Sequence, residues 1–432
     1  MRKIEIGILG AGTVGGGLWD LLHKNRDLIR RKSGIDLKIA KVADKDPKRK
    51  GVLGIPDDIF TEDPNEVLEH PDIDIVVELI GGTTVARELI IRAAENCKHI
   101  VTANKALLAR HGLEVFKRVV ESEVEIGFEA SVGGGIPIIK TIREALVGNR
   151  VKKIIGILNG TSNFILTKMT REGIDFKRAL EAAQRLGFAE ADPYLDISGG
   201  DARHKITILS SFAFNTMIEH DSVYMEGIDG IDIKDIGYAE EFGFVTKLLA
   251  VAQLTDHGIL VKVHPTLVSR ENPLAAVLWE DNAVMVESDY LGTSMYYGKG
   301  AGAKPTASAV VADVVDISER ILSKSEYNSK RYTFFRDLPQ LEFETNRARY
   351  YFRFTVLDRP GILSKISGVL GQNNISIASV IQKEKEEELK YVPLIMMTHD
   401  AVEADVKRAI AKIDSFPEVK KNSKLIRVLT DR

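Results

Sequence analysis

A glycine-rich turn between a strand pattern and a helix pattern constrains this chain most. Residues 3–9 alternate in polarity and are rich in isoleucine, Gly10, Gly12 and Gly15 follow at Gly-x-Gly-x-x-Gly spacing, and leucines then recur at helical spacing as far as Leu28. In this context the first glycine allows a tight turn, the second lets a pyrophosphate approach the backbone, and the third allows close helix packing. We therefore expect a dinucleotide at this turn, facing the helix N-terminus. The alternative is a glycine-rich turn without a ligand.

Strand and helix patterns continue to alternate as far as residue 130. The run 72–79 is almost wholly apolar, as in parallel strands that are buried on both faces. We expect strands at 37–43, 72–79, 99–102 and 125–130, and helices at 85–96 and 107–122. The alternation predicts an α/β domain over residues 1–130, built on a doubly wound parallel sheet.

The regular alternation of strands and helices ends after residue 131, and beyond it strand and helix patterns occur in mixed order. We expect an α+β domain over residues 131–325, with strands at 153–158, 260–267 and 283–288 and helices at 163–172, 176–186, 205–214, 245–256 and 305–322. Residues 326–348 are polar and lack a clear period, so they are expected to form a linker. Residues 349–432 follow the order βαββαβ, the ferredoxin-like arrangement, with the charged run 383–390 as a solvated hairpin tip.

Composition argues against several classes of partner. The net charge is -3 and 44% of the residues are hydrophobic, so nothing indicates a nucleic acid or an anionic membrane as partner. The single cysteine, Cys97, rules out an intrachain disulfide and a cysteine-cluster metal site, and it is expected to be a small core residue. No apolar run approaches the roughly 20 residues that span a membrane, and no signal peptide is visible. We therefore expect a cytoplasmic protein.

Two charged residues begin the helix that follows Gly199 and Gly200. Asp201 and Lys205 are four apart, so they share one helix face. That face continues through the apolar Ile208, Leu209 and Phe212, while the polar face is expected on Arg203, Thr207 and Ser210. Burying a carboxylate and an amine is costly unless they are paired or used. The pair is therefore either a buried salt bridge that fixes the helix or an acid/base lysine held by an aspartate beside a pocket.

The end of the second strand carries conflicting signals for the cofactor. Asp44 could accept hydrogen bonds from an adenosine ribose, which favours NAD. Lys45, Lys48, Arg49 and Lys50 follow at once, and cations there suit the 2′-phosphate of NADP. The residues alone leave both cofactors open.

Two further positions could meet a substrate. Lys105 follows a strand of the expected sheet, at the edge where ligands bind in open α/β folds, although it could also be a solvated helix-start residue. Glu190 and Asp192 lie in a loop before Pro193 and could hold an ammonium group, or they could belong to a solvated turn. In the C-terminal unit, the turns at 358–363 and 371–376 could bind a small amphipathic molecule, or they could be plain turns.

Taken together, these segments resemble the homoserine dehydrogenase family. The motifs that carry the resemblance are the Gly-x-Gly-x-x-Gly turn and the segments 77–82, 102–105, 129–137, 159–163, 187–193, 200–205 and 298–308, which cover nearly all of residues 1–325. The C-terminal unit resembles an ACT domain through residues 358–361 and 374–376. The resemblance implies an N-terminal Rossmann domain, a catalytic and dimerisation domain, and a monofunctional enzyme rather than one fused to aspartate kinase.

The resemblance implies a reaction and roles for single residues. The reaction is the NAD(P)-dependent interconversion of L-homoserine and L-aspartate 4-semialdehyde, on the route to threonine, methionine and isoleucine. Lys205 would be the general acid/base with Asp201 as its partner, and Glu190 would bind the amino group of the substrate. Cofactor contacts are implied at Gly10, Gly12, Thr13, Val14, Gly15, Asp44, Gly302 and Lys105, the last of which would also contact substrate. A monovalent cation such as sodium would be held by Glu129 with the carbonyls of Val132, Gly134 and Ile136.

The resemblance also suggests partners. It favours NADP over NAD, a homodimer or homotetramer, and threonine as the effector of the ACT domain. The effector residues would be Asp358, Gly361, Ile362, Leu363, Asn373 and Asn374. The alternatives are a C-terminal unit that only strengthens oligomerisation, another NAD(P)-dependent semialdehyde or amino-acid dehydrogenase, and a non-catalytic amino-acid sensor.

Overall fold

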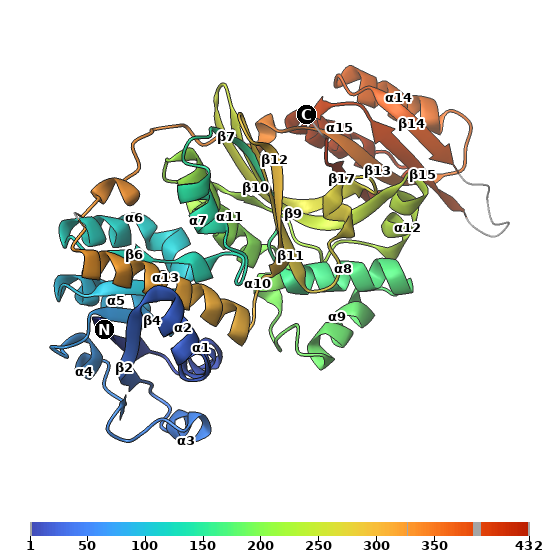
Figure 1. Cartoon of the computed structure of the whole chain (residues 1–432). Helices are drawn as coiled ribbons and strands as arrows, with labels where there is room; N and C mark the ends of the chain where they lie inside the picture. Colours follow the sequence, from blue (N-terminus) through green and yellow to red (C-terminus); the bar gives the residue numbers. More distant parts are fainter. Residues whose placement is uncertain (1, 326, 383–389, 431–432) are drawn as a thin grey trace. The chain divides into compact units, whose positions relative to one another are not determined.

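The chain divides into two compact units (Figure 1). The computed structural model describes residues 2–325, 327–382 and 390–430, so that residues 383–389 of the expected hairpin tip lie outside the described part. The first unit comprises Met1–Gly160, Asp201–Asp221 and Asp281–Leu338. The second comprises Thr161–Gly200, Ser222–Glu280 and Pro339–Arg432.

The first unit contains a parallel sheet of six strands in the order β3-β2-β1-β4-β5-β6. The strands are β1 (Arg2–Leu9), β2 (Ile35–Ala43), β3 (Phe60–Thr61), β4 (Ile75–Glu78), β5 (His99–Thr102) and β6 (Ile126–Gly127). The helices between them are α1 (Thr13–Lys24), α2 (Arg26–Ser33), α3 (Lys48–Leu53), α4 (Asn65–Leu68), α5 (Val85–Glu95) and α6 (Lys105–Glu121). The expected doubly wound sheet is therefore confirmed. Its direction of winding changes between β1 and β4, where ligands bind in such folds.

The core of this sheet is completed by a helix from much later in the chain. Ile4, Ile6 and Ile8 of β1 are almost fully buried, and they belong to one apolar cluster with residues of α13 (Ala303–Ser323). Helix α13 packs directly on α1 (Figure 1). A Cβ at Gly17 would lie 2.7 Å from the carbonyl oxygen of Ala303, so only glycine permits this close approach.

The rest of the first unit adds a small antiparallel sheet and the helix that carries the charged pair. Strands β7 (Val151–Ile157), β11 (Asp281–Ser288) and β12 (Gly292–Lys299) pair in that order, and α7 (Ile138–Lys140) and α11 (Gly200–Phe214) complete the unit. Strand β12 was not predicted from the sequence, because its exposed, glycine- and serine-containing residues lack an apolar alternation. It was also wrong about Cys97, which is exposed and has a φ of 55° in the turn after α5.

In the second unit, the helix expected at 245–256 is wrong. This segment is β9 (Phe244–Thr255), which pairs antiparallel along its length with β10 (Gly258–Ser269). A continuous apolar run that is buried on both faces has no period that distinguishes a strand from a helix. The remaining elements before residue 339 are α8 (Gly160–Glu172), α9 (Phe176–Arg185), α10 (Tyr194–Ile197), β8 (Tyr224–Met225) and α12 (Ile233–Glu241).

The C-terminal part of the second unit has the expected βαββαβ order. Its elements are β13 (Arg347–Leu357), α14 (Ile362–Gln372), β14 (Ile377–Gln382), β15 (Tyr391–Thr398), α15 (Glu403–Asp414) and β17 (Val419–Val428), with a two-residue strand β16 (Ala401–Val402) before α15. Alternate residues Tyr350, Phe352 and Phe354 of the central strand β13 are fully buried against the two helices. Strand β17 also pairs in parallel with β10, so this sheet continues into the β9–β10 hairpin.

The segment 326–348 is anchored by two buried aromatic residues. The Tyr332 hydroxyl donates to Oε2 of Glu125 at 2.5 Å and accepts from the backbone N–H of Ile126 at 3.2 Å, within the first unit. Within the second unit, Phe343 stacks on Tyr224 with ring centroids 3.5 Å apart. The segment is therefore packed at Tyr332 and at Phe343.

Candidate active site

Helix α11 is buried on nearly all sides. The sequence analysis was wrong to expect a polar face here, because Thr207 is 1% exposed and Ser210 is fully buried. Their hydroxyls donate to the backbone carbonyls of Arg203 and Ile206, four residues earlier, at 2.8 and 2.6 Å. Short hydroxyl side chains can satisfy themselves on their own helix in this way, so they do not mark a solvated face.

The carboxylate of Asp201 joins the residues that the sequence analysis proposed separately. It is almost fully buried, and its Oδ2 accepts from Nζ of Lys205 at 2.7 Å and from Nδ2 of Asn159 at 2.9 Å. Its Oδ1 lies 2.7 Å from Nζ of Lys105. Lys205 also donates to the carbonyl of Leu158 at 2.6 Å. Asn159 was missed as a site residue, although it belongs to one of the recognised motifs.

The electrostatics of this cluster favour an ionised Asp201. Burial by itself would raise the pKa of this carboxyl, but the ammonium groups of Lys205 and Lys105 outweigh burial and hold the pKa well below its usual range. Two cations thus share one anion. The resulting positive potential suits a group that develops negative charge during a reaction.

The two lysines differ in access to solvent. The side chain of Lys105 is 37% exposed, whereas that of Lys205 is 7% exposed. Lys105 begins α6, and the preceding Asn104 caps this helix by accepting from the backbone N–H of Leu107 at 3.1 Å. Lys105 is therefore held at the C-terminal edge of β5, as expected from the sequence.

Glu78 is a second residue that the sequence analysis left without a role. Its Oε2 accepts from the hydroxyl of Thr102 at 2.6 Å, and its Oε1 accepts from the backbone N–H groups of Ile80 and Gly81 at 2.8 and 3.0 Å. Glu78 is fully buried and ends β4, while Thr102 ends β5. The contact therefore fixes the ends of two neighbouring strands, immediately before Lys105.

The glycine turn is closely packed at two of its three glycines. Gly10 has a φ of 102°, and a Cβ there would lie 2.9 Å from the carbonyl carbon of Leu79. A Cβ at Gly15 would collide with the carbonyl oxygen of Gly10, whereas a Cβ at Gly12 would meet nothing within 4 Å. Gly10 and Gly15 are thus needed for packing, and Gly12 faces open space.

The N-terminus of α1 is open to an anion. Thr13 and Val14 form its first turn, which has no side-chain cap and no acidic residue. Its backbone N–H groups and the positive end of the helix dipole therefore suit a phosphate. Gly302, the other expected contact, has a φ of 116° and precedes the first residue of α13.

Asp44 supports the glycine turn directly. Its Oδ2 accepts from the backbone N–H of Ala11 at 2.6 Å, and its Oδ1 accepts from the backbone N–H of Asp46 at 2.9 Å. Both oxygens thus have protein partners. The sequence analysis considered only the ribose as a partner for this carboxylate.

The expected cation residues lie in one turn after β6. The carboxylate of Glu129 is buried and accepts from the backbone N–H groups of Ile139 and Lys140 at 2.8 and 2.7 Å, and burial raises its pKa to about 7. The carbonyl of Ile136 accepts from the N–H of Ile138 at 2.8 Å. The carboxylate of Glu129 therefore caps α7.

Two glycines shape the main chain of this turn. Gly133 and Gly134 have positive φ values of 73° and 54°. They turn the chain within the segment 132–136, which contains the carbonyls expected to bind the cation. Over the described residues, no group of three or more His, Cys, Asp or Glu side chains could hold a metal ion.

Glu190 lies in the second unit, in the loop between α9 and α10. It is exposed, and its carboxylate makes no hydrogen bond or ion pair with another described residue. The carboxylate of nearby Asp192 accepts from the backbone N–H of Tyr194 at 3.1 Å. Of the two loop carboxylates, only that of Glu190 is without such a bond.

The six expected effector residues lie at opposite ends of α14. Gly361 has a φ of 89° and precedes the helix, and Leu363 is 40% exposed, while Ile362 is buried. Asn373 follows the helix and donates to the carbonyl of Val369 at 2.9 Å, and Asn374 has a φ of 58°. A helix of 11 residues is about 16 Å long, so within one chain the turn at Asp358 and the asparagines do not form one site.

Comparisons with known proteins agree with this arrangement. The family model for the NAD-binding domain of homoserine dehydrogenase matches residues 10–129, the model for homoserine dehydrogenase itself matches residues 137–315, and the model for the ACT domain matches residues 350–418. A homoserine dehydrogenase of Pseudomonas aeruginosa is 44% identical over 97% of each chain, and one of Neisseria gonorrhoeae is 44% identical over 99% of each.

Solved structures extend the similarity to three dimensions. A homoserine dehydrogenase from Thiobacillus denitrificans superposes with a TM-score of 0.94, at 42% identity and with 99% of each chain covered. A hyperthermophilic archaeal homoserine dehydrogenase in complex with NADPH gives a TM-score of 0.64 at 28% identity, covering 76% of this chain and 100% of that one. In the described residues no helix has the length and apolar character needed to cross a membrane. The chain therefore belongs to the homoserine dehydrogenase family, as an NAD(P)-dependent oxidoreductase that interconverts L-homoserine and L-aspartate 4-semialdehyde and carries a C-terminal ACT domain.

Proposed function

We propose that Lys205 is the general acid and base of this reaction and that Asp201 holds it in place. The observation that carries the proposal is the buried carboxylate of Asp201 between the ammonium groups of Lys105 and Lys205, each 2.7 Å away. The bound nicotinamide supplies the hydride for reduction of the aldehyde and accepts it in the reverse direction. The ammonium group of Lys205 then stabilises the developing alkoxide and donates a proton to it. In homoserine oxidation the same amine accepts that proton.

Lys105 and Glu190 have different tasks in this proposal. Lys105 is the more exposed lysine and lies at the C-terminal edge of the parallel sheet, which supports contact with both cofactor and substrate. The exposed carboxylate of Glu190 binds the ammonium group that homoserine and its semialdehyde share. This contact exists before and after hydride transfer, so Glu190 positions the substrate.

The dinucleotide would be held by the turn at Gly10, Gly12 and Gly15 and by the first turn of α1, with Gly302 nearby in the fold. We infer a preference for NADP. Two observations support it: both oxygens of Asp44 already accept backbone hydrogen bonds, and Lys45, Lys48 and Arg49 are exposed beside it. Because its oxygens already have protein partners, Asp44 is less available to the hydroxyls of an adenosine ribose. The exposed cations attract a 2′-phosphate, and Arg49 among them also pairs with Asp46, with 3.6 Å between Nε and Oδ2.

Three further proposals concern partners. A monovalent cation such as sodium would be held by Glu129 with the carbonyls of Val132, Gly134 and Ile136. Threonine is the proposed effector of the ACT domain. A homodimer or homotetramer in the cytoplasm is the proposed form of the enzyme. Activity in sodium against choline salts, the rate across a threonine series and the molar mass in solution test these points separately.

The decisive experiment measures homoserine oxidation by the full chain with NADP and with NAD in separate assays, followed at the absorbance of the reduced cofactor. Turnover with homoserine and a higher kcat/KM for NADP are expected. A panel of other aldehydes and amino alcohols should give much lower kcat/KM. Equal use of both cofactors would reject the NADP preference without affecting the assigned reaction.

A further inference from the structure

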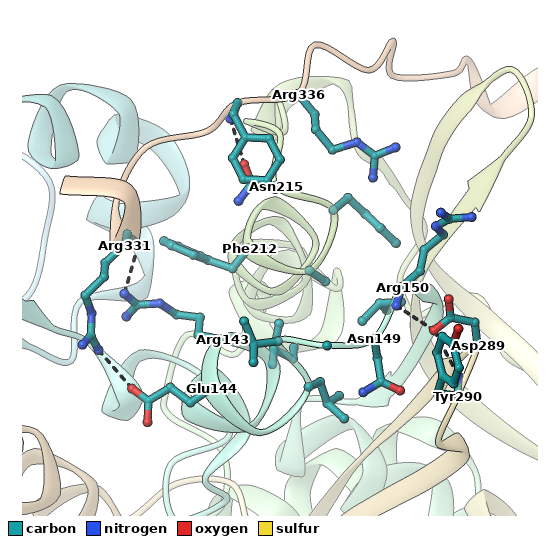
Figure 2. A pocket seen from close by; sticks show the side chains of 18 of the residues that line it. Arg143, Glu144, Asn149, Arg150, Phe212, Asn215, Asp289, Tyr290, Arg331 and Arg336 are labelled. Carbon is teal, nitrogen blue, oxygen red and sulfur yellow. Dashed lines mark hydrogen bonds and ion pairs between the residues drawn. The ribbon is translucent and has the colours of Figure 1, made fainter. Parts of the chain in front are cut away.

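The first unit contains a large cavity away from Asp201 and the glycine turn. Its volume is about 800 Å³, and five arginines line it: Arg143, Arg150, Arg320, Arg331 and Arg336. They come from the α7–β7 connection, from α13 and from the segment after it, and the last turn of α11 forms another wall. Figure 2 shows several of these side chains around one space.

Three of the arginines are already used within the protein. Arg320 contacts both oxygens of Asp316 at 3.0 and 3.1 Å, and Arg331 contacts Oε1 of Glu144 at 3.0 Å. Arg143 donates to the carbonyl of Arg331 at 3.0 Å and lies over the ring of Phe212, 5.4 Å from its centroid. These contacts have structural explanations, because each cation has a carboxylate, carbonyl or aromatic partner.

Arg150 and Arg336 are different. Neither guanidinium group forms a hydrogen bond or an ion pair with another residue in the described part of the chain, and no dashed line reaches either in Figure 2. The nearby carboxylate of Asp289 accepts from the backbone N–H groups of Arg150 and Tyr290 at 2.8 and 3.0 Å. That carboxylate is therefore engaged by the backbone of its own turn.

Two asparagines add further donors to the same cavity. Oδ1 of Asn149 accepts from the backbone N–H of Leu291 at 3.0 Å, and Oδ1 of Asn215 accepts from the backbone N–H of Phe335 at 2.8 Å. Because a backbone N–H can only donate, these bonds fix the carbonyl end of each amide, and the NH₂ ends remain as donors. The cavity is thus rich in donors with few acceptors to match.

The helix ends at the cavity do not account for this charge. The C-terminal ends of α11 and α13 each contribute about half a negative charge. Arg150 and Arg336 together carry two positive charges and make no hydrogen bond to the carbonyls of either helix. A concave site with unneutralised arginines attracts anions, and the guanidinium fork matches carboxylates and phosphates.

We propose that this cavity binds a small organic molecule with two or more anionic groups, phosphates or carboxylates, through Arg150 and Arg336. Asn149 and Asn215 would donate further hydrogen bonds to its oxygens. The apolar part of the molecule would lie against the wall formed by Phe212 and Tyr290. The occupant would contact the same helix that carries Asp201 and Lys205, at its opposite end.

The test uses the full chain and two simple probes, inorganic tripolyphosphate and citrate, in titration calorimetry at physiological chloride. Saturating NADP is present throughout, so that the probes cannot bind at the glycine turn. At least one probe should bind, and monovalent acetate should not compete. The double variant R150Q/R336Q should bind at least about tenfold more weakly, since each lost charge-assisted contact weakens binding by about this factor. The single variant R347Q, which removes an exposed arginine of β13 outside the cavity, should bind like the wild type.

The outcomes separate the possible explanations. The tighter of the two probes identifies phosphate or carboxylate as the ligand chemistry. The melting temperature of ligand-free R150Q/R336Q should match that of the wild type, because neither side chain has a partner to lose. No binding of either probe, or equal binding by R150Q/R336Q and the wild type, would overturn the proposal.

Discussion

The ammonium group of Lys105 lies 2.7 Å from Oδ1 of Asp201, although Lys105 begins α6 and Asp201 lies in the first turn of α11. This contact joins the C-terminal edge of the parallel sheet to the helix that carries Lys205. The proposed proton donor, Lys205, and the sheet edge proposed to hold the cofactor thereby meet at one carboxylate. With Lys105 and Lys205 both bound to the single carboxylate of Asp201, the cluster keeps a net positive charge.

Replacing Lys205 with methionine should remove most of kcat while dinucleotide affinity stays nearly unchanged. A general acid or base contributes about 10²–10⁴-fold to the rate. Steady-state kinetics with homoserine and a fluorescence titration of the reduced cofactor measure the two quantities. The control is K168M, because Lys168 also pairs with a carboxylate four residues away, Glu172 at 2.6 Å, on helix α8. A K205M enzyme with the kcat of the wild type would show that another group moves the proton.

Glu190→Ala should act mainly on KM for homoserine. An anchor for the amino group contributes equally to binding of the ground state and the transition state, so its loss raises KM and leaves kcat nearly unchanged. D192A is the matched control, because the carboxylate of Asp192 is occupied by the N–H of Tyr194. If E190A and D192A share one KM for homoserine, Glu190 does not bind the amino group.

The sequence predicted the parallel sheet because two signals coincided there: glycines at a strand–helix junction and a strict alternation of strands and helices. It failed at β9, because an apolar run that is buried on both faces looks the same in a strand and in a helix. The predicted polar face of α11 failed for a different reason. Thr207 and Ser210 bond to their own helix, so their polarity says nothing about solvent.

The candidate site could be predicted only in part. The i, i+4 spacing of Asp201 and Lys205 is local, so the sequence contained it. The contacts of Asp201 with Lys105 and Asn159, and of Asp44 with Ala11, join segments far apart in the chain. No local pattern encodes such pairs, because they depend on how the strands and helices pack.

Asp44→Asn should shift cofactor use further toward NADP. The change removes one negative charge near the expected 2′-phosphate, and one unit charge at short range in a solvated site corresponds to roughly fivefold in affinity. Because Asn keeps only one acceptor oxygen, the turn at Ala11 should loosen slightly and KM should rise for both cofactors. The ratio of kcat/KM for NADP and NAD measures the effect. D58N is the control, since Asp58 is an exposed carboxylate between α3 and β3. The same ratio in both variants would exclude Asp44 as a determinant.

Buried histidines should make the enzyme sensitive to acid. His204 is 6% exposed and stacks on His220, and neither of its ring nitrogens has a hydrogen-bond partner among the described residues. Burial, followed by the charge of His220, lowers the pKa of His204 to about 4, with Arg110 and Lys105 acting in the same direction and Asp201 against them. The unfolded chain therefore binds more protons than the native state between about pH 6.5 and pH 4, and stability falls as the pH falls through this window.

The His204 contribution to this loss is on the order of 2–3 kcal/mol. H204F keeps the stacked ring and cannot be protonated, so it should gain stability relative to the wild type as the pH decreases from 7 to 4. Denaturant unfolding at a series of pH values gives the difference. H257Q, which changes an exposed histidine in the turn between β9 and β10, should follow the wild type. Parallel pH curves for H204F and the wild type would rule out His204 as the source.

The response to threonine should depend on the side chain of Asn374. This residue has a φ of 58°, a conformation that glycine adopts without strain, so N374G removes the amide side chain while keeping the turn after α14. If threonine binds there, half-maximal inhibition should require about tenfold more threonine, as expected for the loss of well-placed hydrogen bonds. N422G is a matched control, since Asn422 also has a positive φ, 70°, and lies in β17 of the same domain. Point variants are preferable to truncation, because removing β17 would take away one of the two strands that pair with β10 at Thr266 and Leu267. A wild-type enzyme whose rate and melting temperature stay constant across millimolar threonine would leave the ACT domain with a purely structural role.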